Sequence, residues 1–351
     1  MTPGRFYRPQ LDVVRFCAFL AVFGHHTLPR TGDHSRWLTT AADAMGFGLS
    51  LFFVLSAYLI TLLLLREREQ TGSIHLVPFY KRRALRIWPL YLLGIGIGVV
   101  RAVSHGVFLQ QKTWFIAALL LSGNLIYPGT ILMSHLWSIS IEEQFYLFFP
   151  SACRTFGRRG MLLFALVLIV AANVTLIHFA HIHADLDVRV WFSSFVQFEM
   201  FAAGILLALA DKHLPRWSVV VSLFASGGAA LLWFGATAVF HLKTTGAVAS
   251  SAAGLCVGYA TVAAACCLLL VAVQGLPSPA PMVYSGKVSY GLYVFHLPVI
   301  ALVSARFATY SVGVLVSMVL TYGLAALSYR YFELPFLQRR QHLQLIPTRA
   351  I

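Results

Sequence analysis

Two adjacent carboxylates, Glu142 and Glu143, lie in the stretch HLWSISIEEQFYLFFP, which is otherwise mostly aromatic and aliphatic. On a helix, which turns about 100° per residue, Ser138 and Glu142 share a face and Glu143 is turned away from it. A carboxylate in an apolar setting is suited to orient an imidazole and to raise its basicity. We therefore predict that one of the two glutamates assists a histidine in proton transfer. For each glutamate, structural pairing with a basic residue is the alternative.

The histidine that fits this chemistry best lies in the first apolar run, RPQLDVVRFCAFLAVFGHH. Arg15 follows Asp12 by three positions and precedes His26 by eleven, so the three side chains form one helical stripe over about 16 Å. His25 points about 100° away from this stripe and is the weaker candidate. The alternatives are a structural ion pair between Asp12 and Arg15 and an ordinary interfacial histidine at position 26.

Arginines cluster in FYKRRALRIWPLY, at the entrance of a later apolar run. Arg83 and Arg86 share a helix face, and guanidinium groups at a helix entrance are suited to hold phosphates. Anchoring at the cytoplasmic interface is the alternative, and we favour it for the neighbouring Lys81 and Arg82. His296, in SGKVSYGLYVFHLPVI, is a further candidate near the middle of another run, where a hydrogen-bonded core histidine is the alternative.

The composition places these residues in an integral membrane protein. Of the 351 residues, 59% are hydrophobic and 11% are charged, and apolar runs of about 20 residues recur along the chain. No long polar stretch remains for a soluble domain, so we predict one membrane domain over residues 1–340 and a short cytoplasmic tail over 341–351. The first run lacks a small-residue cleavage site, which favours a retained span. The five cysteines follow no disulfide or zinc spacing, and no metal site is expected.

We predict an all-α bundle of about ten transmembrane helices with both termini in the cytoplasm. The spans are expected at 11–29, 47–65, 87–104, 137–152, 161–180, 192–210, 217–240, 247–273, 288–305 and 309–330. The run 114–127 is short and is broken by Gly123 and Asn124, which favours an interfacial or re-entrant segment. This arrangement leaves 17 Lys and Arg inside and 6 outside, whereas counting 114–127 as a span leaves 11 and 12. The excess of positive charge inside supports ten spans.

The net charge of +14 follows from this orientation and from contact with anionic membrane lipids. It therefore gives no reason to expect a nucleic acid partner. Ionisable residues at membrane depth crowd into the first four predicted spans, which is where a site is expected.

Segments along nearly the whole chain resemble acyltransferase family 3, a group of bacterial integral-membrane O-acyltransferases that act on O-antigen, exopolysaccharide, peptidoglycan and macrolides. The resemblance rests on RPQLDVVRFCAFLAVFGHH, SLFFVLSAYLITLLLLRE, FYKRRALRIWPLY, HLWSISIEEQFYLFFP, SGKVSYGLYVFHLPV and YRYFELPFL. The first segment fits the family's pattern of Arg, ten residues and His, at Arg15 and His26. The third contains an Arg-x-x-Arg, at Arg83 and Arg86. The resemblance implies that these four residues are functional and that Glu142 or Glu143 is the acidic member.

The second segment departs from the family at two positions. Ser50 stands where an acidic residue often precedes the Phe-Phe stretch, so the role of that acid does not carry over to this chain. The dipeptide Ser56-Ala57 stands where the family usually has Ser-Gly.

The resemblance implies transfer of an acyl group, usually acetyl, from cytoplasmic acyl-CoA to a hydroxyl of a glycan, a lipid-linked sugar or another acceptor at the outer face. The expected location is the bacterial inner membrane. Acetyl-CoA serves as donor substrate, and no tightly bound cofactor is expected. In this layout Arg83 and Arg86 hold phosphates at the cytoplasmic end, and Glu142 lies about 8 Å inside the outer end, at the depth of His26. His26 acts as general base or, less directly, as a transient acyl carrier.

A proton-coupled membrane transporter is the alternative function, since buried His, Glu and Arg also suit a proton relay. Such a transporter is expected to show paired halves with interrupted helices at matching positions, and no such repeat is evident in the sequence. A scaffold without chemistry is a third possibility. The sequence leaves open the acceptor, the choice between acetyl and a longer acyl group, which glutamate acts, and the oligomeric state.

Overall fold

The computed structural model describes residues 7–29, 36–126, 131–182, 187–244, 251–307 and 309–343. Every regular element in these ranges is a helix and none is a strand, which confirms the all-α prediction. Six of the described helical segments are long and apolar enough to cross a membrane, and a bent pair adds a seventh if it counts as one span. Ten crossings and the orientation of the termini therefore remain predictions.

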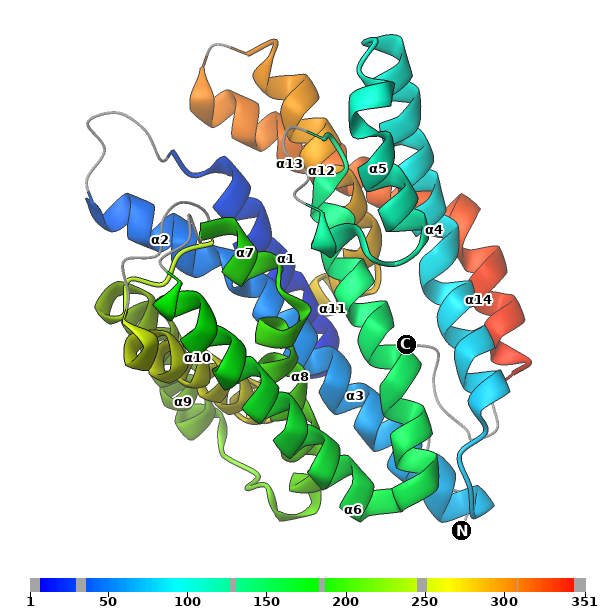
Figure 1. Ribbon diagram of the computed structural model, residues 1–351, viewed down its shortest axis with the longest axis vertical. Helices are drawn as coiled ribbons and strands as arrows, with labels where there is room; N and C mark the ends of the chain where they lie inside the picture. Colours follow the sequence, from blue (N-terminus) through cyan, green and yellow to red (C-terminus); the bar gives the residue numbers. More distant parts are fainter. Residues whose placement is uncertain are drawn as a thin grey trace. The chain divides into compact units, whose positions relative to one another are not determined.

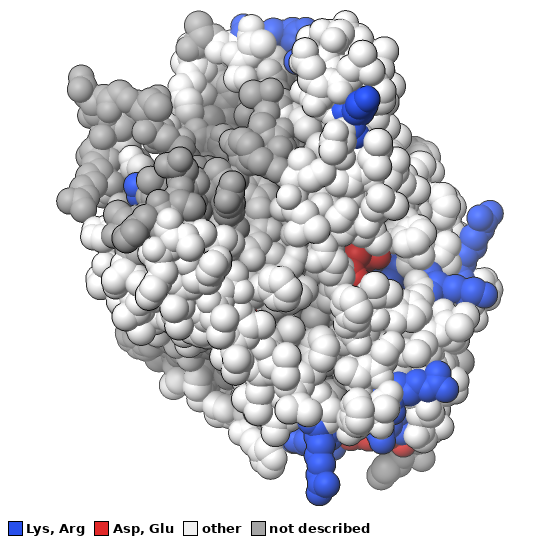
Figure 2. All heavy atoms as spheres, in the orientation of Figure 1, with Lys and Arg blue, Asp and Glu red and all other residues white. Residues whose placement is uncertain are grey.

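The surface of these helices is largely apolar. Large hydrophobic side chains are strongly exposed on several of them, among them Leu120 at 72%, Phe224 at 79% and Leu231 at 76%. Figure 2 shows one face of the molecule, on which uncharged residues form most of the surface and Lys and Arg side chains are few. Apolar side chains exposed on long helices with internally satisfied backbones are typical of contact with lipid.

Backbone contacts divide the chain into two compact units. The first contains the described residues within 1–7, 75–146 and 287–351, and the second those within 8–74 and 147–286. Helix α6, Trp137–His181, begins in the first unit and continues in the second. The apolar runs of the sequence give no sign of this division.

The first unit is built mainly from α4 and the C-terminal helices. Figure 1 draws α4 in cyan beside α14 in orange-red, and the two helices are in contact. The elements of this unit are α4 (Leu76–Ser104), α5 (Phe108–Leu119), the short 3-10 turns Gly123–Leu125 and Ser134–Leu136, the start of α6, α12 (Ser289–Ser304), α13 (Tyr310–Ser328), the π-helical turn Tyr329–Glu333 and α14 (Leu334–Gln341).

The run predicted to be interfacial or re-entrant begins in α5. This helix has 12 residues and is about 18 Å long, which is too short for a hydrocarbon core of about 30 Å. The chain reverses at Leu121, which has a positive φ of 56°, and then forms the turn Gly123–Leu125. Among the described residues between α4 and α6, no helix is long enough to cross a membrane.

This detour places the start of α6 partway along α4. A Cβ added at Gly94 would lie 3.0 Å from side-chain atoms of Leu136 and Met133, just before α6 begins. Gly94 precedes the end of α4 by ten residues, or about 15 Å. The sequence prediction assumed that α6 starts level with the outer end of the bundle. Glu142 follows the start of α6 by five residues, or about 8 Å, and its depth in a membrane stays a prediction.

The second unit contains the N-terminal helices and the middle of the chain. Its elements are α1 (Pro9–Thr27), α2 (Arg36–Gly46), α3 (Gly48–Thr71), the rest of α6, α7 (Asp187–Phe192), α8 (Ser194–Leu209), the 3-10 turn Asp211–His213, α9 (Val219–Val239), α10 (Ala252–Ala272) and most of α11 (Ala280–Lys287). Gly157 interrupts α6 with φ 61° and ψ −144°. The predicted spans 137–152 and 161–180 lie on the two arms of this broken helix.

Small residues let α3 and α8 approach closely. A Cβ added at Gly204 would lie 2.3 Å from the carbonyl oxygen of Val54 and 2.8 Å from Cβ of Ala57. Ala57 is one of the two positions where the chain departs from the resembled pattern, which has glycine there. At this helix crossing, α8 supplies the glycine in place of α3.

An ionic network joins three segments of the second unit. The guanidinium of Arg8 donates two hydrogen bonds of 2.8 Å to the carboxylate of Asp211, and the hydroxyl of Tyr58 contacts both groups. Burial by itself raises the pKa of Asp211, but the hydrogen bonds from Arg8 and Tyr58 and the charges of Arg8 and Arg66 hold that pKa below its ordinary value. The network ties the residue before α1 to α3 and to the turn after α8.

We expect Asp211→Asn to weaken the acid sensitivity of the fold. Because the folded-state pKa of Asp211 is depressed, its stabilisation is present above the unfolded value of about 3.9 and is lost as the pH falls through the folded pKa. The thermal unfolding midpoint in detergent should therefore fall more steeply below about pH 4 in the wild type than in the variant. Glu69→Gln is the control, since the Glu69 pair with Lys212 is exposed. Parallel pH profiles for wild type and Asp211→Asn would contradict this assignment.

Candidate active site

The stripe predicted on α1 lies wholly within the second unit. Asp12 and Arg15 form an ion pair in which both side chains are largely buried, so the ion pair given as the alternative for these residues is present. The backbone of Gly286 approaches this turn so closely that an added Cβ would lie 1.9 Å from the carbonyl oxygen of Asp12. The start of α1 is therefore fixed against α11, and Arg15 has a carboxylate partner on its own helix.

The two histidines at the end of α1 occupy different environments. His25 is buried, and its Nδ1 lies 2.7 Å from the carbonyl oxygen of Ala42. A carbonyl oxygen can only accept, so Nδ1 of His25 carries the hydrogen. An added Cβ at Gly46 would lie 2.6 Å from this ring, which is thus closely packed. His26 is exposed, and its ring stands edge-on to His25 at 4.7 Å. Of the pair, only His26 is open to a reactant.

In the first unit, Arg83, Tyr146 and Glu142 form a connected cluster. The guanidinium of Arg83 lies over the Tyr146 ring, 5.4 Å from its centroid, and also over the ring of Phe79. The Tyr146 hydroxyl donates to the Glu142 carboxylate. Nε of Arg83 is buried and has no hydrogen-bond partner among the described residues. Two aromatic rings thus hold the guanidinium in place by cation–π contact and leave part of its donor capacity unused.

Glu143 lies beside this cluster and is hydrogen-bonded to a residue of another helix than its own. Its Oε2 accepts a 2.9 Å hydrogen bond from the indole of Trp88 on α4. Its Oε1 is buried and has no hydrogen-bond partner in the described parts of the chain. Both Glu142 and Arg83 act on this carboxylate electrostatically. Because buried polar atoms are nearly always hydrogen-bonded, the open oxygen calls for a functional explanation.

Arg86 lies near a different acid. It acts electrostatically on Glu333, which accepts a 3.2 Å hydrogen bond from Ser328. Gly291 of α12 also approaches this carboxylate, since an added Cβ would lie 3.3 Å from its Oε1. Arg83 and Arg86 thus share a helix face as predicted but lie beside different carboxylates. The adjacent Arg82 donates to the carbonyl oxygen of Leu343, which is a structural contact.

Ser138 and His296 belong to a separate buried cluster. The Ser138 hydroxyl lies 2.6 Å from the hydroxyl of Tyr293, which donates to the carbonyl oxygen of His135. Nδ1 of His296 lies 2.5 Å from the carbonyl oxygen of Tyr293, and the rings of His135 and His296 stand edge-on at 5.0 Å. His296 thus has the environment of a hydrogen-bonded core histidine, the alternative given for it. Within the described residues, no group of three metal-ligating side chains occurs.

Sequence reasoning did not single out Trp88, Tyr146, Glu333 or Glu199. Tyr146 follows Glu142 by four positions, a helical spacing that marks it as a partner. Glu199, on α8 of the second unit, is 5% exposed, and its Oε2 has no hydrogen-bond partner among the described residues. An acidic residue in an apolar helix is itself a signal for a site. The contact of Trp88 depends on the rotation of α4 against α6, which no spacing rule predicts.

Comparison with known proteins finds similarity to acyltransferases over nearly the whole chain. The family model described as "Acyltransferase domain" matches residues 8–330. The O-acetyltransferase OatA of Staphylococcus aureus (strain NCTC 8325 / PS 47) is 30% identical over 94% of this chain and 57% of that protein. The putative O-acetyltransferase SAR0937 of Staphylococcus aureus (strain MRSA252) is 28% identical over 98% of this chain and 59% of that protein. The chain thus spans less than two thirds of these relatives. No solved structure matches it.

Proposed function

The chain belongs to the acyltransferase 3 family, and from this premise we propose that it is a membrane O-acetyltransferase that uses acyl-CoA as donor. The observation that carries the proposal is the cluster of Arg83, Tyr146, Glu142 and Glu143 in an apolar helical unit. Burying such charges is costly, and ionisable residues at membrane depth are functional by default. The names of the relatives, OatA and the putative O-acetyltransferases, support acetyl as the transferred group.

In this proposal Arg83 and Arg86 bind the phosphates of CoA. The cation–π contacts of Arg83 with the rings of Phe79 and Tyr146 support this role, because a guanidinium already held in place loses less conformational freedom on binding. Its buried Nε has no hydrogen-bond partner among the described residues, so the donor capacity of this arginine is not filled there. Arg15, which is also predicted to bind the donor, is paired with Asp12.

We expect Arg83→Gln and Arg86→Gln each to weaken CoA binding. A charge-assisted contact to phosphate contributes about 1.5–3 kcal/mol, or roughly a 10- to 150-fold change in the dissociation constant. Isothermal titration of the purified protein with CoA measures this change. Arg82→Gln is the matched control, since Arg82 donates to a backbone carbonyl. Unchanged affinity in both test variants would contradict a role of these arginines in CoA binding. Anchoring at the membrane interface would then explain them.

The proposed chemistry is general-base catalysis by His26. Its imidazole takes the proton from the acceptor hydroxyl, whose oxygen attacks the acetyl carbonyl of the thioester. The carbon–sulfur bond then breaks, and CoA leaves as a thiol after taking up a proton. Glu142 remains the predicted acidic member of the site. A transient acetyl group on His26 is the less direct alternative.

The acceptor in this proposal is a hydroxyl of a glycan, a lipid-linked sugar or another molecule on the opposite side of the membrane from the donor. The bacterial inner membrane is the proposed location, because acyl-CoA is cytoplasmic and envelope acceptors lie outside it. The exposure of His26 supports this role, since a general base must reach the hydroxyl that it deprotonates.

A further inference from the structure

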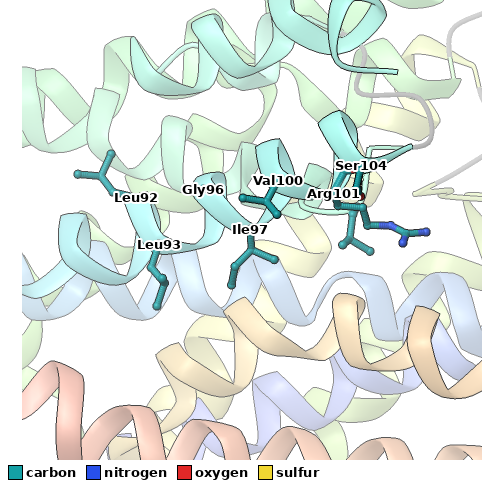
Figure 3. A pocket seen from close by; sticks show the side chains of 8 residues that line it. Leu92, Leu93, Gly96, Ile97, Val100, Arg101 and Ser104 are labelled. Carbon is teal, nitrogen blue, oxygen red and sulfur yellow. Dashed lines mark hydrogen bonds between the residues drawn. The ribbon is translucent and has the colours of Figure 1, made fainter. Parts of the chain in front are cut away.

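An apolar groove of about 640 Å³ runs along one side of α4 in the first unit. Leu93, Ile97 and Val100 line it along the helix, and Arg101 and Ser104 lie at one end, as Figure 3 shows. Its volume lies within the range of about 300–1,000 Å³ that is typical of ligand sites. None of these residues has a part in the acyl transfer proposed above.

Gly96 makes the groove deeper. On the packed face of α4, a Cβ at Gly94 or Gly98 would lie 3.0 Å from side chains of Leu136, Met133 or Phe115, so these two glycines serve helix packing. At Gly96, no atom lies within 4 Å of the added Cβ. Glycine is unfavourable in a helix interior unless a close approach requires it. The open space at Gly96 therefore points to an occupant outside the helix bundle.

The dimensions of the groove match one leaflet of a bilayer. Its lining residues run from Leu92 to Ser104 on α4, which is about 18 Å along the helix, and half of a hydrocarbon core is about 15 Å. Arg101 lies about 27 Å from Arg83 along the same helix, close to the full thickness of that core. With Arg83 at one interface, as proposed above, this length would carry the groove from mid-membrane to the opposite interface, where Arg101 would lie.

The interfacial end of the groove has the chemistry of a phosphate site. Arg101 is exposed, and its guanidinium has no carboxylate or other hydrogen-bond partner among the described residues. The Ser104 hydroxyl and Nδ1 of His105 contact each other at 3.0 Å, and both contact the backbone carbonyl of Arg101. A cation, a hydroxyl and an imidazole thus lie together where lipid headgroups are found.

We propose that this groove binds one anionic, phosphate-headed lipid of the leaflet in which it lies. The phosphate contacts Arg101 and one acyl chain lies along Leu93, Ile97 and Val100 over Gly96. Charge complementarity favours a lipid over a protein helix, because an apolar helix would leave the charge of Arg101 without a counterion at the edge of the membrane. The lipid would stay with the protein when bulk lipid is removed.

Native mass spectrometry of the full-length protein in detergent with added phosphatidylglycerol tests this site. The wild type should retain one molecule at concentrations where Arg101→Gln and Gly96→Leu bind it about tenfold less, the first by losing the charge and the second by filling the groove. Because no atom lies within 4 Å of an added Cβ at Gly96, the leucine side chain starts into open space. Helical circular dichroism and the thermal midpoint verify that each variant is folded.

Matched controls are Arg306→Gln and Gly323→Leu. Arg306 is another exposed arginine just beyond a helix end of this unit, and Gly323 is another helical glycine with no atom within 4 Å of an added Cβ. Both controls should bind phosphatidylglycerol as the wild type does, and phosphatidylcholine should bind the wild type more weakly. Equal retention in Arg101→Gln or in Gly96→Leu would overturn the proposal. A dimer that Gly96→Leu dissociates would identify a second copy as the occupant and would also overturn it.

Discussion

We expect His26→Ala to abolish acetyl transfer in membranes where the wild-type chain supports it, while affinity for CoA stays within about twofold. Loss of a general base typically lowers the rate about 10²- to 10⁴-fold. CoA affinity is spared because the proposed phosphate contacts come from Arg83 and Arg86, on a different unit of the chain. Incorporation of radiolabelled acetyl into alkali-labile ester measures the transfer, and isothermal titration of the same variant measures the binding.

The neighbouring histidine supplies the control for this prediction. His25→Ala removes a buried ring that donates to the carbonyl oxygen of Ala42, which should cost about 1–3 kcal/mol of stability. Its transfer rate per folded molecule should stay near that of the wild type. The account fails if folded His25→Ala is inactive while His26→Ala remains active, because the chemistry would then lie on the buried side of α1.

Glu142→Gln should lower the transfer rate by roughly 10²-fold or more, and Glu143→Gln should lower it less. The amide at position 142 can still accept the hydrogen bond from Tyr146, so the local packing is kept. What disappears is the negative charge that is linked through Tyr146 to Arg83. The pH profile of transfer should change with it, because an ionisable group is removed from the proposed site.

Glu143→Gln is the matched comparison because it removes the same charge one residue away. Its Oε2 is held by Trp88, and an amide oxygen accepts that bond equally well. Labelled acetyl transfer across pH for the two variants decides between them. A larger loss in Glu143→Gln would reverse the assignment, and wild-type rates in both would remove the glutamates from the mechanism.

Features that depend on a single helix could be predicted from the sequence. The pair of Asp12 and Arg15 and the difference between His25 and His26 follow from helical spacing alone, and the structure has both. The apolar runs also indicate an all-helical chain, and the short, broken run at 114–127 indicates a segment that does not cross. In each case the evidence is the spacing of residues on one helix or the length of one apolar run.

Contacts between helices could not be predicted in the same way. Arg83 and Glu142 come from separate segments, and their link through Tyr146 depends on how α4 is rotated against α6. The start of α6 beside Gly94 was not predicted, because the path of the chain after α5 has no signature in hydropathy. Glu333 was passed over because Arg86, which acts on it electrostatically, lies in a distant part of the sequence, on α4.

The most direct test of acetyl transfer by His26 uses inverted membrane vesicles, in which the cytoplasmic face is outward. Vesicles from cells that express the wild type, His26→Ala or His25→Ala receive radiolabelled acetyl-CoA, and label that is released by mild alkali from washed vesicles is counted over time. We expect label to accumulate with the wild type and His25→Ala and to stay at the level of vesicles without the protein with His26→Ala. Accumulation at the wild-type rate with His26→Ala would contradict the account.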